Sequence, residues 1–201
     1  MKSKFERKLE KVKEAAIKEN IPIIMDETLI KIKETLQELK KNTINKILEI
    51  GTATGYSALC FSELLTENGE IDTIERDTER IAKAKENIKI LEGNKKINLY
   101  EGDAVEILKQ MDNRYDLIFI DASKSKYPIF LEESLRMLNP NGIIFADNVL
   151  YKGYVMSDYN KHKQRTAVTH LREFIKNARE NEELHTEISE VGDGLAIIYK
   201  K

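Results

Sequence analysis

The sequence lacks the features of a membrane protein or a disulfide-stabilised protein. It contains one cysteine, Cys60, so no disulfide bond can form within the chain, and we expect Cys60 to be a small buried residue in a helix. No apolar stretch approaches the roughly 20 residues that span a bilayer. The N-terminal segment is charged throughout and has no signal-peptide core. We therefore expect a cytoplasmic, soluble protein without a membrane partner.

The sequence also has no excess of charge of one sign. Lys and Arg together number 33 and Asp and Glu 35, so the net charge is close to zero. Such a chain does not attract nucleic acid through its overall field, and any contact with nucleic acid must come from a local patch. The length of 201 residues is sufficient for one α/β domain with a full core.

Short apolar runs alternate with amphipathic stretches along most of the chain. Two helices rich in Lys and Glu are predicted first, at 2–19 and 26–41, separated by Pro22. Strands are then predicted at 46–50, 70–75, 96–100, 115–120, 142–146, 184–191 and 194–200. Helices are predicted between them at 56–67, 77–91, 103–111, 127–138 and from about 159 to 180.

This alternation is typical of βαβ units and a parallel sheet. The last two runs are joined through Gly192-Asp193, which indicates an antiparallel hairpin at the edge of the sheet. We expect a single α/β domain over residues 1–201. It consists of a helical N-terminal extension, 1–44, and a Rossmann-like core, 45–201, whose doubly wound sheet has seven strands.

The stretch "LEIGTATGYSAL" at 48–59 ends the first strand of this core and begins a helix. In open parallel sheets, ligands bind beyond the carboxyl ends of the strands. Gly51 and Gly55 allow close approach of the backbone to a ligand, but their spacing differs from the G-x-G-x-x-G fingerprint of NAD enzymes. Glu49 repels phosphate and favours a cation. A NAD-dependent oxidoreductase is therefore disfavoured, and a plain strand-to-helix turn is the simpler alternative.

Two further strand ends carry acids. Glu75 closes the second strand, where a carboxylate can accept both hydroxyls of a ribose, and Asp103 follows the third, where it can accept from an adenine amino group. Together with Glu49, they describe a site for a nucleoside with a cationic, amino-acid-like chain. This description fits S-adenosyl-L-methionine.

Oxygen-bearing side chains also follow strands four and five. Asp121 ends the fourth strand, and Asp147 and Asn148 end the fifth. Neighbouring strands bring such residues to one edge of the sheet, and their oxygens suit Mg²⁺, Mn²⁺ or Ca²⁺. Helix capping is the alternative. Lys124 follows Asp121 by three residues, and we expect a nearby metal and sulfonium to lower its pKa and make it a general base.

At this point residues 45–200 resemble the metal-dependent class I O-methyltransferases of the catechol and caffeoyl-CoA type. The resemblance rests on "LEIGTATGYSAL", "IFIDASKSKYP", "ADNVLYKGYV" and "VGDGLAI". It implies a class I methyltransferase fold, a homodimer, a metal held by Asp121, Asp147 and Asn148, and catalysis by Lys124 and Asp121. It implies cofactor contacts by Met25, Glu49, Gly51, Thr52, Gly55, Tyr56, Ser57, Glu75, Arg76, Gly102, Asp103, Ala104 and Asp121.

Within this family, the short chain looks most similar to the tRNA 5-hydroxyuridine methyltransferases, which make 5-methoxyuridine at the wobble position. A chelated metal favours acceptors with two neighbouring oxygens, and both 5-hydroxyuridine and catechols have them. The catalytic centre therefore does not distinguish tRNA from a small phenolic substrate. A binding module that keeps the fold without catalysis is disfavoured by the presence of Asp121, Lys124, Asp147 and Asn148.

The rim predicted around the acceptor offers a further indication. Residues 151–165 interleave tyrosines with basic side chains, which suits a single-stranded loop such as the tRNA anticodon loop. An ordinary charged surface is the alternative. The candidate RNA contacts are Lys152, Tyr154, Lys161, Lys163 and Arg165.

Overall fold

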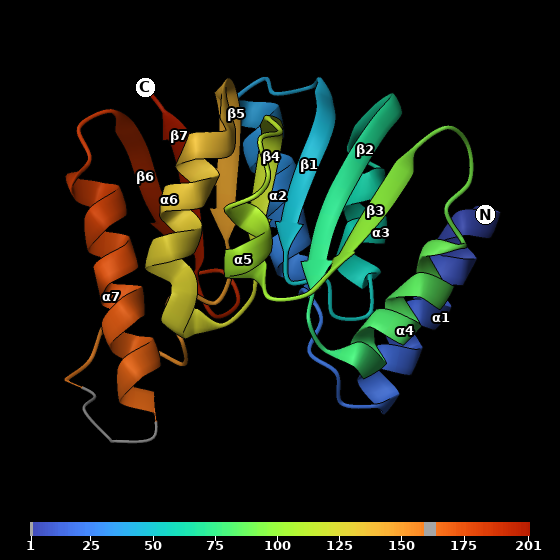
Figure 1. The fold of residues 1–201 in the computed structure, drawn as a ribbon, viewed down its shortest axis with the longest axis horizontal. Helices are drawn as coiled ribbons and strands as arrows, with labels where there is room; N and C mark the ends of the chain where they lie inside the picture. Colours follow the sequence, from blue (N-terminus) through green and yellow to red (C-terminus); the bar gives the residue numbers. More distant parts are fainter. Residues whose placement is uncertain (1, 159–163) are drawn as a thin grey trace.

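The computed structural model describes residues 2–158 and 164–201 and confirms the predicted seven-stranded, doubly wound sheet. The strand order is β3-β2-β1-β4-β5-β7-β6 (Figure 1), with five parallel strands followed by the antiparallel β7 and β6. The strands are β1 (Ile44–Ile50), β2 (Leu65–Glu75), β3 (Lys96–Glu101), β4 (Tyr115–Ile120), β5 (Leu138–Ala146), β6 (Leu184–Ser189) and β7 (Leu195–Lys200).

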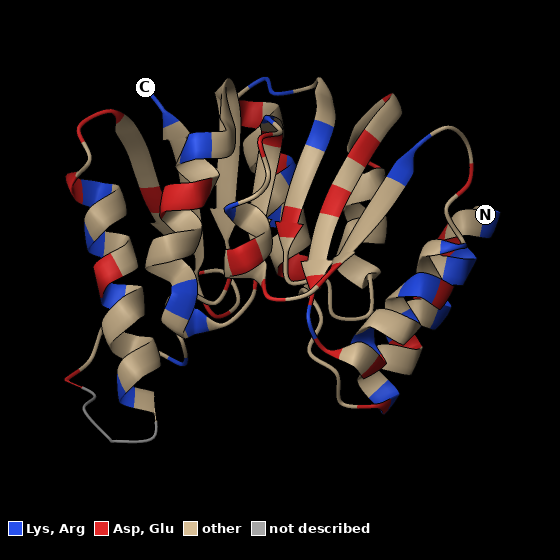
Figure 2. Cartoon of the chain, viewed as in Figure 1, with Lys and Arg blue, Asp and Glu red and all other residues tan. Residues whose placement is uncertain are grey.

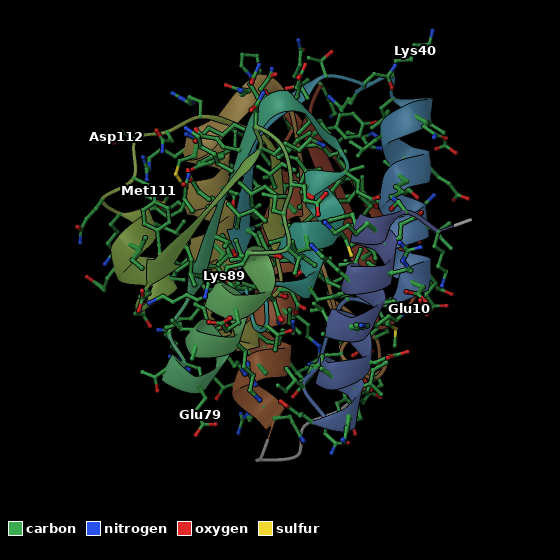
Figure 3. The ribbon with its side chains drawn as sticks, turned by 90° about the vertical axis from the view of Figure 1, so that its right-hand side faces the viewer. Glu10, Lys40, Glu79, Lys89, Met111 and Asp112 are labelled. Carbon is green, nitrogen blue, oxygen red and sulfur yellow. The ribbon has the colours of Figure 1, made fainter. Side chains whose placement is uncertain are left out.

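Helices cover both faces of this sheet. In Figure 1, α5, α6 and α7 lie in front of the strands, and α2 and α3 lie behind them. Figure 3 shows the same two layers from the side, with Glu10 and Lys40 on one side and Met111 and Asp112 on the other. The helices are α1 (Lys4–Lys18), α2 (Asp26–Glu38), α3 (Tyr56–Ser62), α4 (Thr78–Ile88), α5 (Ala104–Leu108), α6 (Tyr127–Met137) and α7 (Arg165–Glu180), with a 3₁₀ turn η1 (Lys124–Lys126) before α6.

The register of the parallel strands aligns their carboxyl ends. Ile50 of β1 is paired with Ile74 of β2 and with Ile120 of β4, and Ile120 is paired with Ala146 of β5. The loops that leave β1, β4 and β5 therefore begin at the same level of the sheet. Apolar side chains from alternate positions fill a core on each face, which leaves this edge to the polar residues of the loops.

Several boundaries differ from the sequence prediction, most of all at the starts of β2 and β5. β5 begins at Leu138, directly after α6, rather than at residue 142. Of the helix predicted from about residue 159, residues 159–163 lie outside the described part of the chain, and α7 begins at Arg165. The helix predicted to reach residue 67 ends at Ser62, and β2 begins at Leu65 rather than at residue 70. Leu65 is buried and pairs with Ile44 of β1, so pairing in the sheet outweighs the helical pattern of this segment. Cys60 is buried in α3, as predicted. In the described residues, none of the helices combines the length and apolarity needed to cross a membrane.

Candidate active site

A cavity of about 810 Å³ lies against the loops that follow the parallel strands. Figure 2 shows acidic residues near the lower ends of β1 and β2, which lead into these loops. Most of the residues predicted to contact a nucleoside cofactor line this cavity: Met25, Gly51, Thr52, Tyr56, Ser57, Glu75, Arg76, Gly102, Asp103, Ala104 and Asp121. The structure therefore brings together residues from five separate segments of the chain.

Gly51 allows the loop after β1 to lie directly against the end of β4. Its φ of +107° belongs to the region that glycine adopts without strain, and a Cβ built on it would lie 2.2 Å from the backbone oxygen of Asp121. Gly55 has a φ of +80° and begins α3, but it does not line the cavity. The first glycine therefore serves close approach, whereas the second serves the turn of the chain.

Glu49 also lies outside the cavity lining, immediately beneath the loop. Its side chain is fully buried and accepts a hydrogen bond from the hydroxyl of Thr73. Burial raises the pKa of Glu49 to about 8, although hydrogen bonds from Ser57 and Thr73 favour the charged form. A buried carboxyl group that is costly to ionise gains from a cation placed above it.

Glu75 presents an ordered carboxylate to the cavity. Its Oε2 accepts a hydrogen bond of 2.9 Å from the backbone N–H of Ala53, and its Oε1 accepts from those of Arg76 (2.8 Å) and Asp77 (3.0 Å). These backbone donors fix the orientation of the carboxylate. The remaining lone pairs suit the two hydroxyls of a ribose.

Asp103 combines the cofactor position with helix capping. Its Oδ1 accepts from the backbone N–H of Val105 at 2.9 Å and so caps α5, while its Oδ2 lies 3.6 Å from Nη1 of Arg76. Asp103 also lines the cavity, so one side chain caps α5 and borders the cavity.

The three oxygen-bearing residues predicted for a metal lie in one cluster. The side-chain nitrogen of Asn148 is 3.2 Å from Oδ1 of Asp121, and the backbone N–H of Asn148 donates to Oδ1 of Asp147 at 2.8 Å. Asn148 has a φ of +59°, a conformation that asparagine tolerates better than most residues. Burial raises the pKa of Asp147 to about 7, and the nearby charge of Asp121 contributes to this rise.

This cluster fits a divalent cation because two carboxyl groups in one partly buried place repel each other when both are ionised. Carboxylate and amide oxygens form a hard donor set of the kind that Mg²⁺ prefers. Over residues 2–158 and 164–201, no group of three or more His, Cys, Asp or Glu side chains is arranged to hold a metal ion. The cluster contains two such side chains, Asp121 and Asp147, and Asn148 is its third oxygen-bearing residue.

Lys124 lies beside this cluster and is held by three oxygens. Its Nζ is 2.8 Å from Oδ1 of Asp121, 2.7 Å from the hydroxyl of Tyr127 and 3.4 Å from the backbone oxygen of Asp147. The lowering of its pKa that we expect from a nearby metal and sulfonium stays a prediction. Burial alone lowers the pKa of Lys124, but the interactions with Tyr127 and Asp121 outweigh burial and raise it.

The predicted rim is only partly brought to the cavity. Lys152 lines it, whereas Tyr154 and Arg165 do not, and Lys161 and Lys163 lie outside the described residues. Tyr154 packs edge-to-face against Tyr151, with 6.0 Å between the ring centroids. Of the basic residues predicted in this segment, Lys152 is therefore the one that the described part of the chain presents directly to the cavity.

Several lining residues were not predicted from the sequence. Asp193, in the connection between β6 and β7, accepts a hydrogen bond from the backbone N–H of Lys152 and so holds the loop after β5. Its place in the stretch "VGDGLAI" was a usable signal. Others lie in the stretches quoted above, but no role was predicted for them: Ala53, Thr54, Ala122, Ser123, Lys126 and Tyr151. The rest lie outside those stretches: Pro22, Ile23, Ile24, Ile74, Arg80, Val105 and Phe130.

Comparison with known proteins assigns this arrangement to a family. A family model described as O-methyltransferase matches residues 6–201. A catechol O-methyltransferase of Niastella koreensis is 35% identical over 116 residues, which cover 56% of this chain and 52% of that protein. The match thus spans about half of that relative. A caffeoyl-CoA O-methyltransferase of Populus kitakamiensis is 31% identical over 169 residues, covering 79% of this chain and 71% of that protein.

A solved structure agrees over almost the whole chain. The O-methyltransferase from Bacillus cereus, in complex with SAH, superposes with a TM-score of 0.83 at 26% sequence identity. The superposition covers 97% of this chain and 91% of that one.

Proposed function

The chain belongs to the O-methyltransferase family, and from this premise we propose that it transfers a methyl group from S-adenosyl-L-methionine to an oxygen atom with the help of a divalent metal ion. Its fold is the class I methyltransferase arrangement, with a Rossmann-like sheet and a C-terminal antiparallel hairpin. One observation carries the proposal: a single cavity is lined by the acids suited to the donor, Glu75 and Asp103, and by Asp121, Lys124 and Asp147.

The donor site is supported by the charges and by the relative solved with SAH. Glu75 offers its carboxylate to the ribose and Asp103 to the adenine amino group. The buried acid Glu49 lies beneath the loop, where it favours a cationic methionine chain. Gly51, with no Cβ, permits the backbone to approach the donor closely.

The metal site consists of Asp121, Asp147 and Asn148. We propose Mg²⁺ as the bound ion, with Mn²⁺ or Ca²⁺ as alternatives that the same oxygen donors accept. When bound, such an ion lowers the pKa of the acceptor hydroxyl and orients two neighbouring oxygens of the acceptor. Burial, and then the charge of Asp121, raise the pKa of Asp147, and a cation held by both carboxylates would relieve their repulsion.

Lys124 is the proposed general base. Once it has released its own proton to solvent, its Nζ takes the proton of the acceptor hydroxyl. The freed electron pair on oxygen forms the new O–C bond, the C–S bond of the donor breaks, and its electron pair stays on the sulfur of the product. Holding the two reactants in line removes much of the entropic barrier, about 7–11 kcal/mol in favourable cases.

For the acceptor we propose 5-hydroxyuridine at the wobble position of a tRNA. Its O5 hydroxyl and O4 carbonyl are neighbouring oxygens. Lys126 and Lys152 both line the cavity, and neither has a carboxylate partner within the described part of the chain, so both are available to phosphate. Arg165, exposed at the start of α7 and outside the cavity lining, is a further candidate contact to phosphate.

Small catechol-like phenols are the second candidate acceptor, which the names of the two relatives favour. We further propose a homodimer. Ile17 of α1 and Ile30 of α2 are 58% and 56% exposed, respectively, and give the N-terminal helices apolar surface that a second copy can cover.

The test begins with the donor class. SAH should raise the melting temperature of the purified protein, and NAD should not. Methyl transfer is then measured with two acceptors, dihydroxyphenols and tRNA that carries 5-hydroxyuridine, with Mg²⁺ or with EDTA. Transfer to tRNA that EDTA abolishes supports the proposal. Transfer to dihydroxyphenols alone assigns the second acceptor, and stabilisation by NAD alone refutes the methyltransferase assignment.

A further inference from the structure

Tyr127 connects the proposed base to the proposed metal-binding loop without reaching the cavity. Its side chain is fully buried, and it is absent from the cavity lining. Its hydroxyl lies 2.7 Å from Nζ of Lys124 and 2.7 Å from the backbone oxygen of Asp147. The same hydroxyl lies 3.3 Å from the backbone oxygen of Ile120, at the end of β4. It therefore joins three points around the site.

The position of this hydroxyl is fixed from two directions. The turn η1 leads directly from Lys124 into Tyr127, the first residue of α6. Its ring packs edge-to-face against Phe174 of α7, with 5.4 Å between centroids, and lies 6.3 Å from the ring of Phe130. Close packing of the ring leaves the hydroxyl little freedom to move.

Hydrogen-bond chemistry decides what the hydroxyl offers to the lysine. A carbonyl oxygen only accepts, so the Tyr127 proton is donated to Asp147, and a lone pair of the hydroxyl remains for an N–H of Lys124. Asp121 accepts a second N–H at 2.8 Å. The third contact of the nitrogen, to the backbone oxygen of Asp147, is long at 3.4 Å. Two of the three positions on Nζ are therefore tightly held, and the third is not.

We propose that Tyr127 is a positioning residue for methyl transfer: its hydroxyl, together with Asp121, fixes the rotation of the Lys124 side-chain nitrogen, so that the third, loosely held position on Nζ is the one left for the acceptor hydroxyl. The inference rests on the proposed function, because it assigns Lys124 as the base. It adds a residue that touches neither substrate. A positioning role also gives a reason for the buried Tyr127 hydroxyl beside the ends of β4 and β5, where an apolar side chain would fill the same space.

The test compares Tyr127→Phe with a matched control, Tyr115→Phe. Tyr115 is equally buried, and its hydroxyl donates to Asp72 at 2.8 Å, but it begins β4 at the opposite end from the site. Both variants keep the ring and lose the hydrogen bonds of one buried hydroxyl. We expect Tyr127→Phe to lower kcat by about tenfold or more, part of the 10²–10⁴-fold that general bases contribute, with KM for donor and acceptor within about twofold. Tyr115→Phe should retain the wild-type kcat.

A double variant separates positioning from a structural role. If Tyr127 acts through Lys124, the variant Lys124→Ala/Tyr127→Phe should have the same kcat as Lys124→Ala. SAH affinity within about twofold of wild type in each variant shows that the site is folded. The acceptor is whichever of the two proposed acceptors the wild type methylates.

The possible results test the positioning role of Tyr127 separately from the proposed methyltransferase function. An unchanged kcat in Tyr127→Phe overturns the inference, as does an equal loss in Tyr115→Phe or a multiplicative loss in the double variant. Wild-type kcat in Lys124→Ala removes the base assignment, and with it the inference. Absence of methyl transfer by the wild type to either acceptor refutes the proposed function itself.

Discussion

Replacing Gly51 by alanine tests whether the site depends on direct contact between the first loop and the end of β4. The new Cβ would lie 2.2 Å from the backbone oxygen of Asp121 and 2.8 Å from its carbonyl carbon, so one backbone segment must move. A left-handed backbone costs an alanine about 1–2 kcal/mol, and forcing packed groups apart costs about 1–3 kcal/mol more. We expect the free energy of unfolding to fall by about 2–5 kcal/mol.

Gly93→Ala provides the matched control. Gly93 has a φ of +90°, close to the +107° of Gly51, but a Cβ added to it would have no atom within 4 Å, so only the backbone cost of about 1–2 kcal/mol applies. Urea denaturation measures the two losses, and isothermal titration calorimetry measures SAH affinity. Gly51→Ala should weaken SAH binding because the displaced loop lines the cavity, while Gly93→Ala should not. Equal losses of stability with unchanged SAH affinity in both variants would refute the close-approach argument.

Three further predictions concern charge at the site. Burial raises the pKa of Glu49 from 4.5 to about 8, so its contribution to the free energy of unfolding is complete below pH 4.5 and is lost as the pH rises through 8. Urea denaturation of the metal-free protein across this pH range should therefore show a smaller loss of stability in Glu49→Gln than in the wild type. Glu75→Ala removes the acceptor of three backbone N–H groups and should weaken SAH binding about tenfold or more by calorimetry, since hydrogen bonds to charged groups contribute about 1.5–3 kcal/mol. EDTA should abolish methyl transfer and leave the thermal shift caused by SAH unchanged, and added Mg²⁺ should restore transfer; activity that survives EDTA would exclude the metal.

The arrangement of strands was predictable from the sequence because each buried strand is a compact apolar run bounded by polar residues. The strand ends then determine which side chains meet, so Glu75, Asp121 and Asp147 were predicted to lie together from position alone. The start of β2 was not predictable, because Leu65 follows an apolar helical stretch and only its pairing with Ile44 makes it a strand residue.

The environment of Lys124 was predicted less well, for a physical reason. The pKa of a lysine depends on every group that faces its nitrogen, and the sequence-based expectation considered only a nearby metal ion and sulfonium. Tyr127 reaches the same nitrogen through the geometry of η1, and a tyrosine at the start of a helix gives no sequence signal of such a contact. The raised pKa therefore follows from packing that the spacing of residues does not encode.

The raised pKa values of two buried acids indicate what the site is built to bind. Burial makes the charged forms of Glu49 and Asp147 unfavourable. Replacing these acids by uncharged residues would therefore increase the stability of the protein without ligands. Lys124 compensates for only one of the neighbouring carboxylates, Asp121, at hydrogen-bond distance. If the proposed donor and metal bind here, a sulfonium near Glu49 and a divalent ion near Asp147 would each favour the charged form of one of these acids. A donor that carries the sulfonium charge would gain an electrostatic attraction that its neutral product lacks, and this difference would favour release of the product after methyl transfer.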